Sequence, residues 1–175
     1  MAGSLVLIEK ITLDSATAEV ILDGIDSTYD VYMVRISNMQ PATDNKNMVF
    51  HVTKSGSADD TSNYDHAFKT FRVNTAFQSS AGTNASSATF GWSQGNGTGE
   101  KLSATLYLFN FPNSSEYSYV SLESAHFQYN DDTARGFYGG FVHTVASASD
   151  GVTFLMESAA DIKSGAKFAL YGISK

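Results

Sequence analysis

Residues 29–37 read YDVYMVRIS, and this stretch decides the fold class. Side chains of a β-strand point alternately to its two faces. In an extended conformation, one face of the stretch carries Val31, Met33 and Arg35. The other face carries Tyr32, Val34 and Ile36. Apolar residues on both faces indicate a strand in the centre of a sheet.

Similar runs of β-branched and aromatic residues lie on both sides of this stretch, separated by Ser, Thr, Gly and Asn. They cover residues 4–13, 16–23, 47–53, 101–111, 117–128, 136–145, 151–157 and 165–173. Helix signals are nearly absent. The pattern predicts an all-β fold, a jelly-roll-type antiparallel β-sandwich of about nine strands with at most one short helix. The 175 residues are expected to form a single domain, 1–175.

Four segments between these runs are harder to assign. Residues 38–46 and 54–63 are polar and predict loops. In residues 64–73, apolar side chains fall at a helical spacing, so that segment is either a short helix or a bent strand. Residues 78–99 are rich in Ser, Gly, Asn and Thr and predict a long exposed loop that makes contacts. The alternating glycines of residues 94–100 indicate a flexible hairpin loop, because no helix follows to bind a phosphate.

The charge and composition exclude several classes of partner. Net charge is −7, with 18 acidic and 11 basic residues, and the basic residues are scattered singly. We therefore expect no binding to nucleic acid or to anionic membranes. The absence of Cys excludes thiolate chemistry and disulfides. The opening residues are too short an apolar run for a signal peptide, and no run is long enough for a membrane-spanning helix.

The residues that could carry chemistry form no strong motif, and neither a cofactor nor a metal is expected. The four histidines, His51, His66, His126 and His143, lie in separate strand-like segments without close sequence partners. The turn of residues 130–133 could hold calcium but lacks a spaced series of ligands. Glu123 and Glu157 are the least implausible pair for glycoside hydrolysis, although charged residues in strands mostly face solvent. The sequence therefore predicts no enzyme.

Aromatic residues are dense in the second half of the chain, with 12 Phe and 9 Tyr overall. Core packing accounts for most of them, and the rest would form a surface patch. Such a patch could be a subunit interface or a face that stacks on sugars. Trp92, Tyr129 and Tyr138 are the candidate surface contacts. Their exposure beside Asn or Asp would favour sugar binding, and burial of all three would weaken it.

Four stretches of the chain resemble small structural proteins from the virions of tailed bacteriophages, especially marine phages. They are residues 3–12 (GSLVLIEKIT), 22–45, 106–111 (LYLFNF) and 151–173. The resemblance covers most of the chain and is weakest over residues 54–100. It implies a component of the particle exterior, either a capsid decoration (cement) subunit or a part of the tail or fibre. No functional residue follows from it.

The resemblance also implies partners and a location. The partners would be further copies of the chain, in a homotrimer or larger ring, and other virion proteins such as the major capsid or tail proteins. The chain would be made in the host cytoplasm and reside in the virion. A carbohydrate-binding module on the same particle, which recognises a host-surface glycan, is the alternative.

Overall fold

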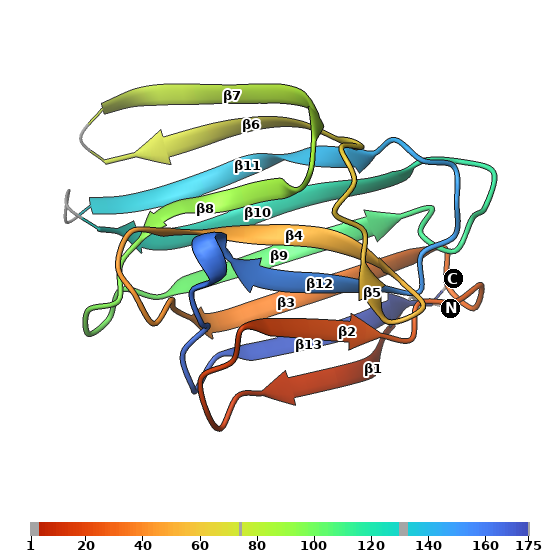
Figure 1. Ribbon diagram of the computed structural model, residues 1–175, viewed down its shortest axis with the longest axis horizontal. Coiled ribbons are helices and arrows are strands. Elements are labelled where there is room, and N and C mark those ends of the chain that lie inside the picture. The colour runs from red at the N-terminus through yellow and green to blue at the C-terminus, as the bar shows by residue number, and fades with distance from the viewer. Residues whose placement is uncertain (1–3, 74, 130–132, 175) are drawn as a thin grey trace.

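The computed structural model describes residues 4–73, 75–129 and 133–174, and its strands form two layers (Figure 1). The large sheet has the order β1 (Leu5–Thr12), β13 (Lys167–Ile173), β3 (Val31–Met39), β9 (Leu102–Phe109), β10 (Ser118–Gln128), β11 (Thr133–His143), β6 (Tyr64–Arg72) and β7 (Thr75–Ala85). The small sheet has the order β2 (Glu19–Asp23), β12 (Gly151–Met156), β4 (Lys46–Lys54) and β8 (Ala88–Gln94). The short β5 (Ser57–Ala58) pairs with β4.

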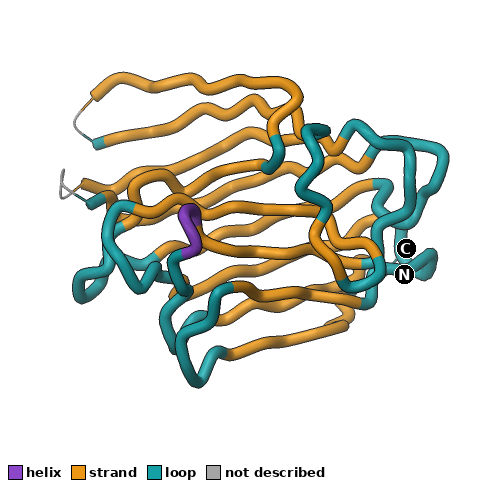
Figure 2. Tube along the Cα trace, viewed as in Figure 1, coloured by secondary structure: helices purple, strands orange, loops and turns teal. Residues whose placement is uncertain are grey.

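The two sheets reproduce the strand order of a jelly roll. Their jelly-roll part is β1-β13-β3-β9 in one layer and β2-β12-β4-β8 in the other, so the chain crosses between layers at almost every step. All the pairings between described strands are antiparallel, and one described residue pair, Gln128 of β10 with Gln94 of β8, links the layers. The predicted all-β jelly-roll fold is confirmed. Figure 2 shows the loops gathered at two ends of the sandwich, with both chain ends at one of them.

Four further strands widen only the large sheet. β10 and β11 come between β9 and β12 in the chain, and β6 and β7 come between β4 and β8. They add to the edge of the jelly roll beyond β9 in the order β10, β11, β6, β7. The large sheet therefore extends past the small sheet, as the upper strands of Figure 1 show.

The core between the layers is made by the inward residues of both sheets. Phe154 of β12 lies 5.5 Å, between ring centroids, from Phe50 of β4 and the same distance from Phe168 of β13. Each of these rings is fully buried, and burial of a side chain of this size stabilises the fold by about 1.5–3 kcal/mol. On β3, Tyr32, Val34 and Ile36 point inward, as the sequence pattern predicts.

The structure corrects several predictions. The described residues form thirteen strands, where about nine were expected. Residues 64–72 of the ambiguous segment form the strand β6, so the helical alternative is wrong. Residues 78–99 are not a long loop, because they contain most of β7 and all of β8. The turn after β8 is no hairpin, because β8 and β9 lie in different sheets. One 3-10 turn, η1 (Glu157–Ala159), is the only helix among the described residues.

Candidate functional site: the open face of the large sheet

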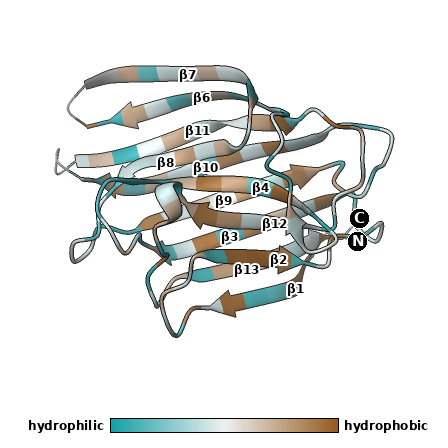
Figure 3. Ribbon diagram, viewed as in Figure 1, coloured by the Kyte–Doolittle hydropathy of each residue, from teal (hydrophilic) through white to brown (hydrophobic). Residues whose placement is uncertain are grey.

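The outer face of the large sheet carries most of the exposed large apolar side chains. The strand register and alternation place eight of them there: Leu5, Leu7, Phe71, Phe77, Tyr107, Phe109, Tyr119 and Tyr138. Their exposed fractions range from 37% for Phe109 to 63% for Phe77 and Tyr138. Figure 3 shows that hydrophobic segments extend to the edge strand β1. We call this surface the open face.

Two rows of paired residues describe the open face. The tyrosine row runs across the strands as Leu7, Tyr171, Met33, Tyr107, Ser121, Gly140, Ala67 and Ala81. The charged row, beside it, runs as Lys10, Ala169, Arg35, Thr105, Glu123, Tyr138, Lys69 and Ser79. In the tyrosine row, large side chains lie on one side of β9 and small ones on the other.

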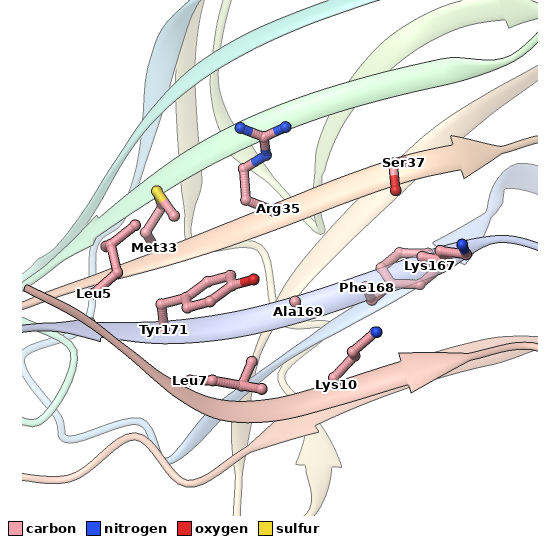
Figure 4. A pocket seen from close by; sticks show the side chains of 10 residues that line it. All are labelled: Leu5, Leu7, Lys10, Met33, Arg35, Ser37, Lys167, Phe168, Ala169 and Tyr171. Carbon is pink, nitrogen blue, oxygen red and sulfur yellow. The ribbon is translucent and has the colours of Figure 1, made fainter.

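The half of the open face on β1, β13 and β3 contains a groove of about 440 Å³ (Figure 4). Ala169 forms its floor, and the register places Lys10 and Arg35 on the strands to either side. Lys167 and Tyr171 come from the same strand as Ala169, and the Tyr171 hydroxyl points along β13 toward Ala169. Among the described residues, no acidic side chain lines this groove. The groove is therefore apolar at its base and cationic at its rim.

The other half contains an apolar hollow of about 470 Å³ over β11, β6 and β7. Small residues, Ala67, Ala81 and Gly140, line it, with Tyr119 at its border. The backbone leaves no room for a side chain at position 140, because a Cβ there would lie only 2.4 Å from the carbonyl oxygen of Val120. The close approach of β10 and β11 therefore keeps a side chain out of the hollow.

A buried polar cluster holds residues 54–63, the segment after β4, against the small sheet. The Tyr64 hydroxyl donates to the Asp59 carbonyl oxygen at 2.6 Å and accepts from the Val52 N–H at 3.0 Å. The Lys54 Nζ lies 2.8 Å from the Asp59 Oδ2, and the His143 Nε2 lies 3.2 Å from the same atom. This cluster ties together β4, β6 and β11.

Burial and charge shift the pKa values in this cluster. Burial raises the pKa of Asp59, but hydrogen bonds from Lys54 and Thr61 outweigh it, so the carboxyl titrates below its usual range. Burial lowers the pKa of His143, and the Lys54 charge adds to this effect. Burial also raises the pKa of the Tyr64 phenol. At neutral pH the cluster therefore holds one Lys54–Asp59 ion pair, a neutral imidazole and a neutral phenol.

A second buried group lies between the layers at the other end of the sandwich. His126 is buried, and its Nε2 lies 2.9 Å from the Trp92 carbonyl oxygen. Burial lowers the pKa of the His126 imidazole to about 4. The guanidinium carbon of Arg135 lies 5.1 Å from the centre of the Trp92 ring. Arg135 donates to the side-chain oxygens of Gln78 and Gln128.

The three predicted contact residues have different environments. Tyr138 is exposed on the open face, but its register neighbours are Glu123 and Lys69 and not Asn or Asp. Trp92 is half-buried and packs edge-on against Phe137, with ring centroids 4.9 Å apart. Tyr129 is also half-buried and donates its backbone N–H to the Ser93 carbonyl oxygen. The open face brings only Tyr138 of the three to a surface patch.

The other predicted candidates do not come together as sites. Glu123 lies on the open face, whereas Glu157 lies in η1 after a strand of the small sheet, so the two carboxylates are in different layers. His51 and His143 both flank Tyr64, at ring centroid distances of 5.9 and 5.0 Å. Across the described part of the chain, no three His, Cys, Asp or Glu side chains are grouped to hold a metal. Residues 130–132 of the predicted calcium turn lie outside the described residues.

Sequence reasoning missed the residues that shape the two halves of the open face. Leu5, Leu7 and Arg35 come together on one surface through the register between β1, β13 and β3, which no local sequence pattern contains.

Comparison of the chain with protein-family models, curated proteins and solved structures finds no significant match. In the described residues, no helix has the length and apolar character needed to cross a membrane.

Proposed function

We propose that this chain is a non-enzymatic structural subunit on the exterior of a tailed-bacteriophage particle, a capsid decoration or a tail or fibre component. It self-assembles through the open face and stabilises the particle. The observation that carries the proposal is the concentration of exposed apolar side chains on one sheet face. The sequence resemblance to phage virion proteins supports the choice of particle.

The open face has the composition of a protein interface. Large contiguous apolar patches on soluble proteins mark interaction sites. Phe109 of β9 pairs with Tyr119 of β10, and Tyr107 lies two residues from Phe109 on the same strand. Aromatic residues of this kind are enriched at interfaces. The core of the sandwich is complete without these side chains, because the inward residues of both sheets fill it. The aromatic side chains of the open face therefore remain available for a partner.

Binding of a host-surface glycan is the second candidate function, and the groove over Ala169 favours it. Its volume of about 440 Å³ suits a small ligand. The Tyr171 ring offers a surface for the C–H groups of a sugar, and Arg35 offers a fork of donors for a carboxylate. This groove would select an acidic sugar.

The test of the proposed function is the solution mass of the purified chain at micromolar concentration, measured by light scattering. We expect a defined oligomer, which the single variant Tyr107→Ser weakens. Mass spectrometry of purified particles should then detect the chain in stoichiometric copies. A monomer that remains monomeric, and that binds acidic glycans on an array until Arg35→Ala removes the binding, would overturn self-assembly in favour of the second candidate.

A further inference from the structure

We propose that two copies of this chain pack face to face through their open faces, about a two-fold axis that runs along β9, so that Arg35 of each copy meets Glu123 of the other. This inference rests on the proposed function, because it names the partner and the geometry of the same surface. It also identifies which residues on one half of the face fit which residues on the other.

The order of strands around β9 allows this symmetry. β3, β13 and β1 follow on one side of β9, and β10, β11 and β6 follow on the other. Adjacent strands are about 4.8 Å apart, and facing sheets pack about 10 Å apart with their strands nearly aligned. A two-fold rotation about β9 therefore places β3 over β10 of the second copy, β13 over β11 and β1 over β6. Residues of one row stay opposite residues of the same row.

The charged row is complementary to itself under this rotation. Arg35 and Glu123 are both exposed and lie one strand to either side of Thr105. The rotation places each Arg35 over Glu123 of the second copy, which forms two symmetric ion pairs around the axis. Because the aromatic residues beside them exclude water, these pairs would be stronger than ordinary surface ion pairs.

The tyrosine row is complementary in size. The rotation places Tyr171 over Gly140 of the second copy and Leu7 over Ala67, so large side chains enter the apolar hollow. In an isologous contact each such fit occurs twice. Tyr107 lies on the axis and meets its own counterpart. The small residues that keep the hollow open therefore match the side chains that protrude on the other half.

The cationic groove receives a partner in the same arrangement. The rotation places Tyr138, which is 63% exposed, over Ala169 of the second copy, between Lys10 and Arg35. An aromatic ring between two cations gains a cation–π attraction. The one like-charge contact is Lys10 with Lys69, and Lys69 has its Nζ 5.5 Å from the centre of the Phe77 ring. The second copy is therefore the occupant that the charges and sizes of this face favour.

A charge-reversal cycle tests the pairing of Arg35 with Glu123. Sedimentation equilibrium would compare the native chain with Arg35→Glu, Glu123→Arg and the double variant. Glu19→Lys would serve as the control, because Glu19 is exposed on β2 of the small sheet and lies outside the open face. We expect an even number of copies for the native chain and a dissociation constant about tenfold or more weaker for each single reversal. The double variant should recover the native value, because it restores opposite charges across the axis.

Cross-linking tests the position of the axis independently of affinity. The chain has no Cys, so a single introduced thiol is unique. Thr105→Cys lies beside its own counterpart across the axis, and a bismaleimide with a span of about 10 Å should join the two copies. Ser79→Cys, in the same row on β7, lies four strands from the axis, about 19 Å, and should not be joined to its counterpart.

The outcomes separate this inference from the proposed function. The two-fold contact would be overturned, and self-assembly would stand, if neither single reversal changed the dissociation constant of the oligomer. The same would follow if the double variant assembled as weakly as the single variants. A trimer whose Thr105→Cys form is not cross-linked would do the same. A native chain that stays monomeric throughout would overturn both proposals. Circular dichroism of each variant confirms that the fold is retained, since both reversed residues are exposed.

Discussion

The Tyr64 hydroxyl is one of several groups that hold residues 54–63 against β4. The side chain is fully buried, and its hydroxyl bridges the Val52 N–H and the Asp59 carbonyl oxygen. A buried backbone group without a partner destabilises the folded state by about 1–3 kcal/mol. The Tyr64 hydroxyl therefore helps to hold residues 54–63 in place.

We predict that Tyr64→Phe lowers the free energy of unfolding by about 1–3 kcal/mol, because it leaves the buried Val52 N–H without its acceptor. The Asp59 carbonyl oxygen loses one of two partners and keeps the His51 Nδ1, which lies 2.9 Å away. The measurement is urea unfolding followed by fluorescence. Tyr117→Phe is the matched control, since it removes the same atom from an exposed ring that is 44% accessible. Equal stability of the two variants would show that the bridge contributes nothing.

Residue-scale alternation was the part of the fold that the sequence predicted best. On β3 the inward set of Tyr32, Val34 and Ile36 matches the predicted alternation, because one face of the strand packs in the core. The dense aromatics of the second half divide in the same way, with Phe137 and Phe141 in the core and Tyr107 on the open face. Sequence alone could not tell core from surface there, because both faces of these strands are apolar.

At the scale of the element, the errors fall on strands near the edge of the large sheet. β6 carries Tyr64 and Phe68 inward but Ala67 and Phe71 outward, and this two-sided apolar pattern imitates a helical spacing. β7 is rich in Ser, Gly and Thr, residues typical of loops. It forms a strand because β6 offers it a partner, and such pairing depends on tertiary context more than on propensity.

The position of β7 predicts its dynamics. Within the described part of the chain, β7 pairs only with β6, whereas β9 pairs with β3 on one side and β10 on the other. We expect amide hydrogens of β7 to exchange with solvent many times faster than those of β9, measured by mass spectrometry of peptides from the native chain. If β7 were protected as strongly as β9, another chain would have to be paired along its free edge.

At the scale of the whole molecule, the open face is a consequence of topology. A jelly roll with two equal sheets buries one face of each and exposes the other evenly. Here two pairs of strands, β10 with β11 and β6 with β7, extend only the large sheet. The added strands supply the small residues of the apolar hollow and Glu123, and the original strands supply Arg35 and Leu7. Because these pairings join distant segments, no local pattern in the sequence could reveal the combined surface.

The whole fold should lose stability as the pH falls below the pKa that His126 has in the unfolded chain. The pKa of buried His126 is about 4, against 6.5 for the exposed side chain. Its neutral form therefore stabilises the fold fully above pH 6.5, and this contribution declines until the pH reaches about 4. The difference corresponds to at most about 3 kcal/mol, and the lowered pKa of His143 adds a loss of the same sign.

We predict that His126→Gln flattens this dependence, because the amide can still donate to the Trp92 carbonyl oxygen but does not titrate. The measurement is the free energy of unfolding by urea at intervals from pH 7.5 to about 4.5, which covers most of the interval over which His126 should lose its contribution. The native chain should lose more stability than the variant over that interval, and the remaining slope of the variant would report His143. Parallel curves for the two proteins would mean that His126 titrates normally, with water reaching its ring, and the layers would then be less tightly closed at that end than their packing indicates.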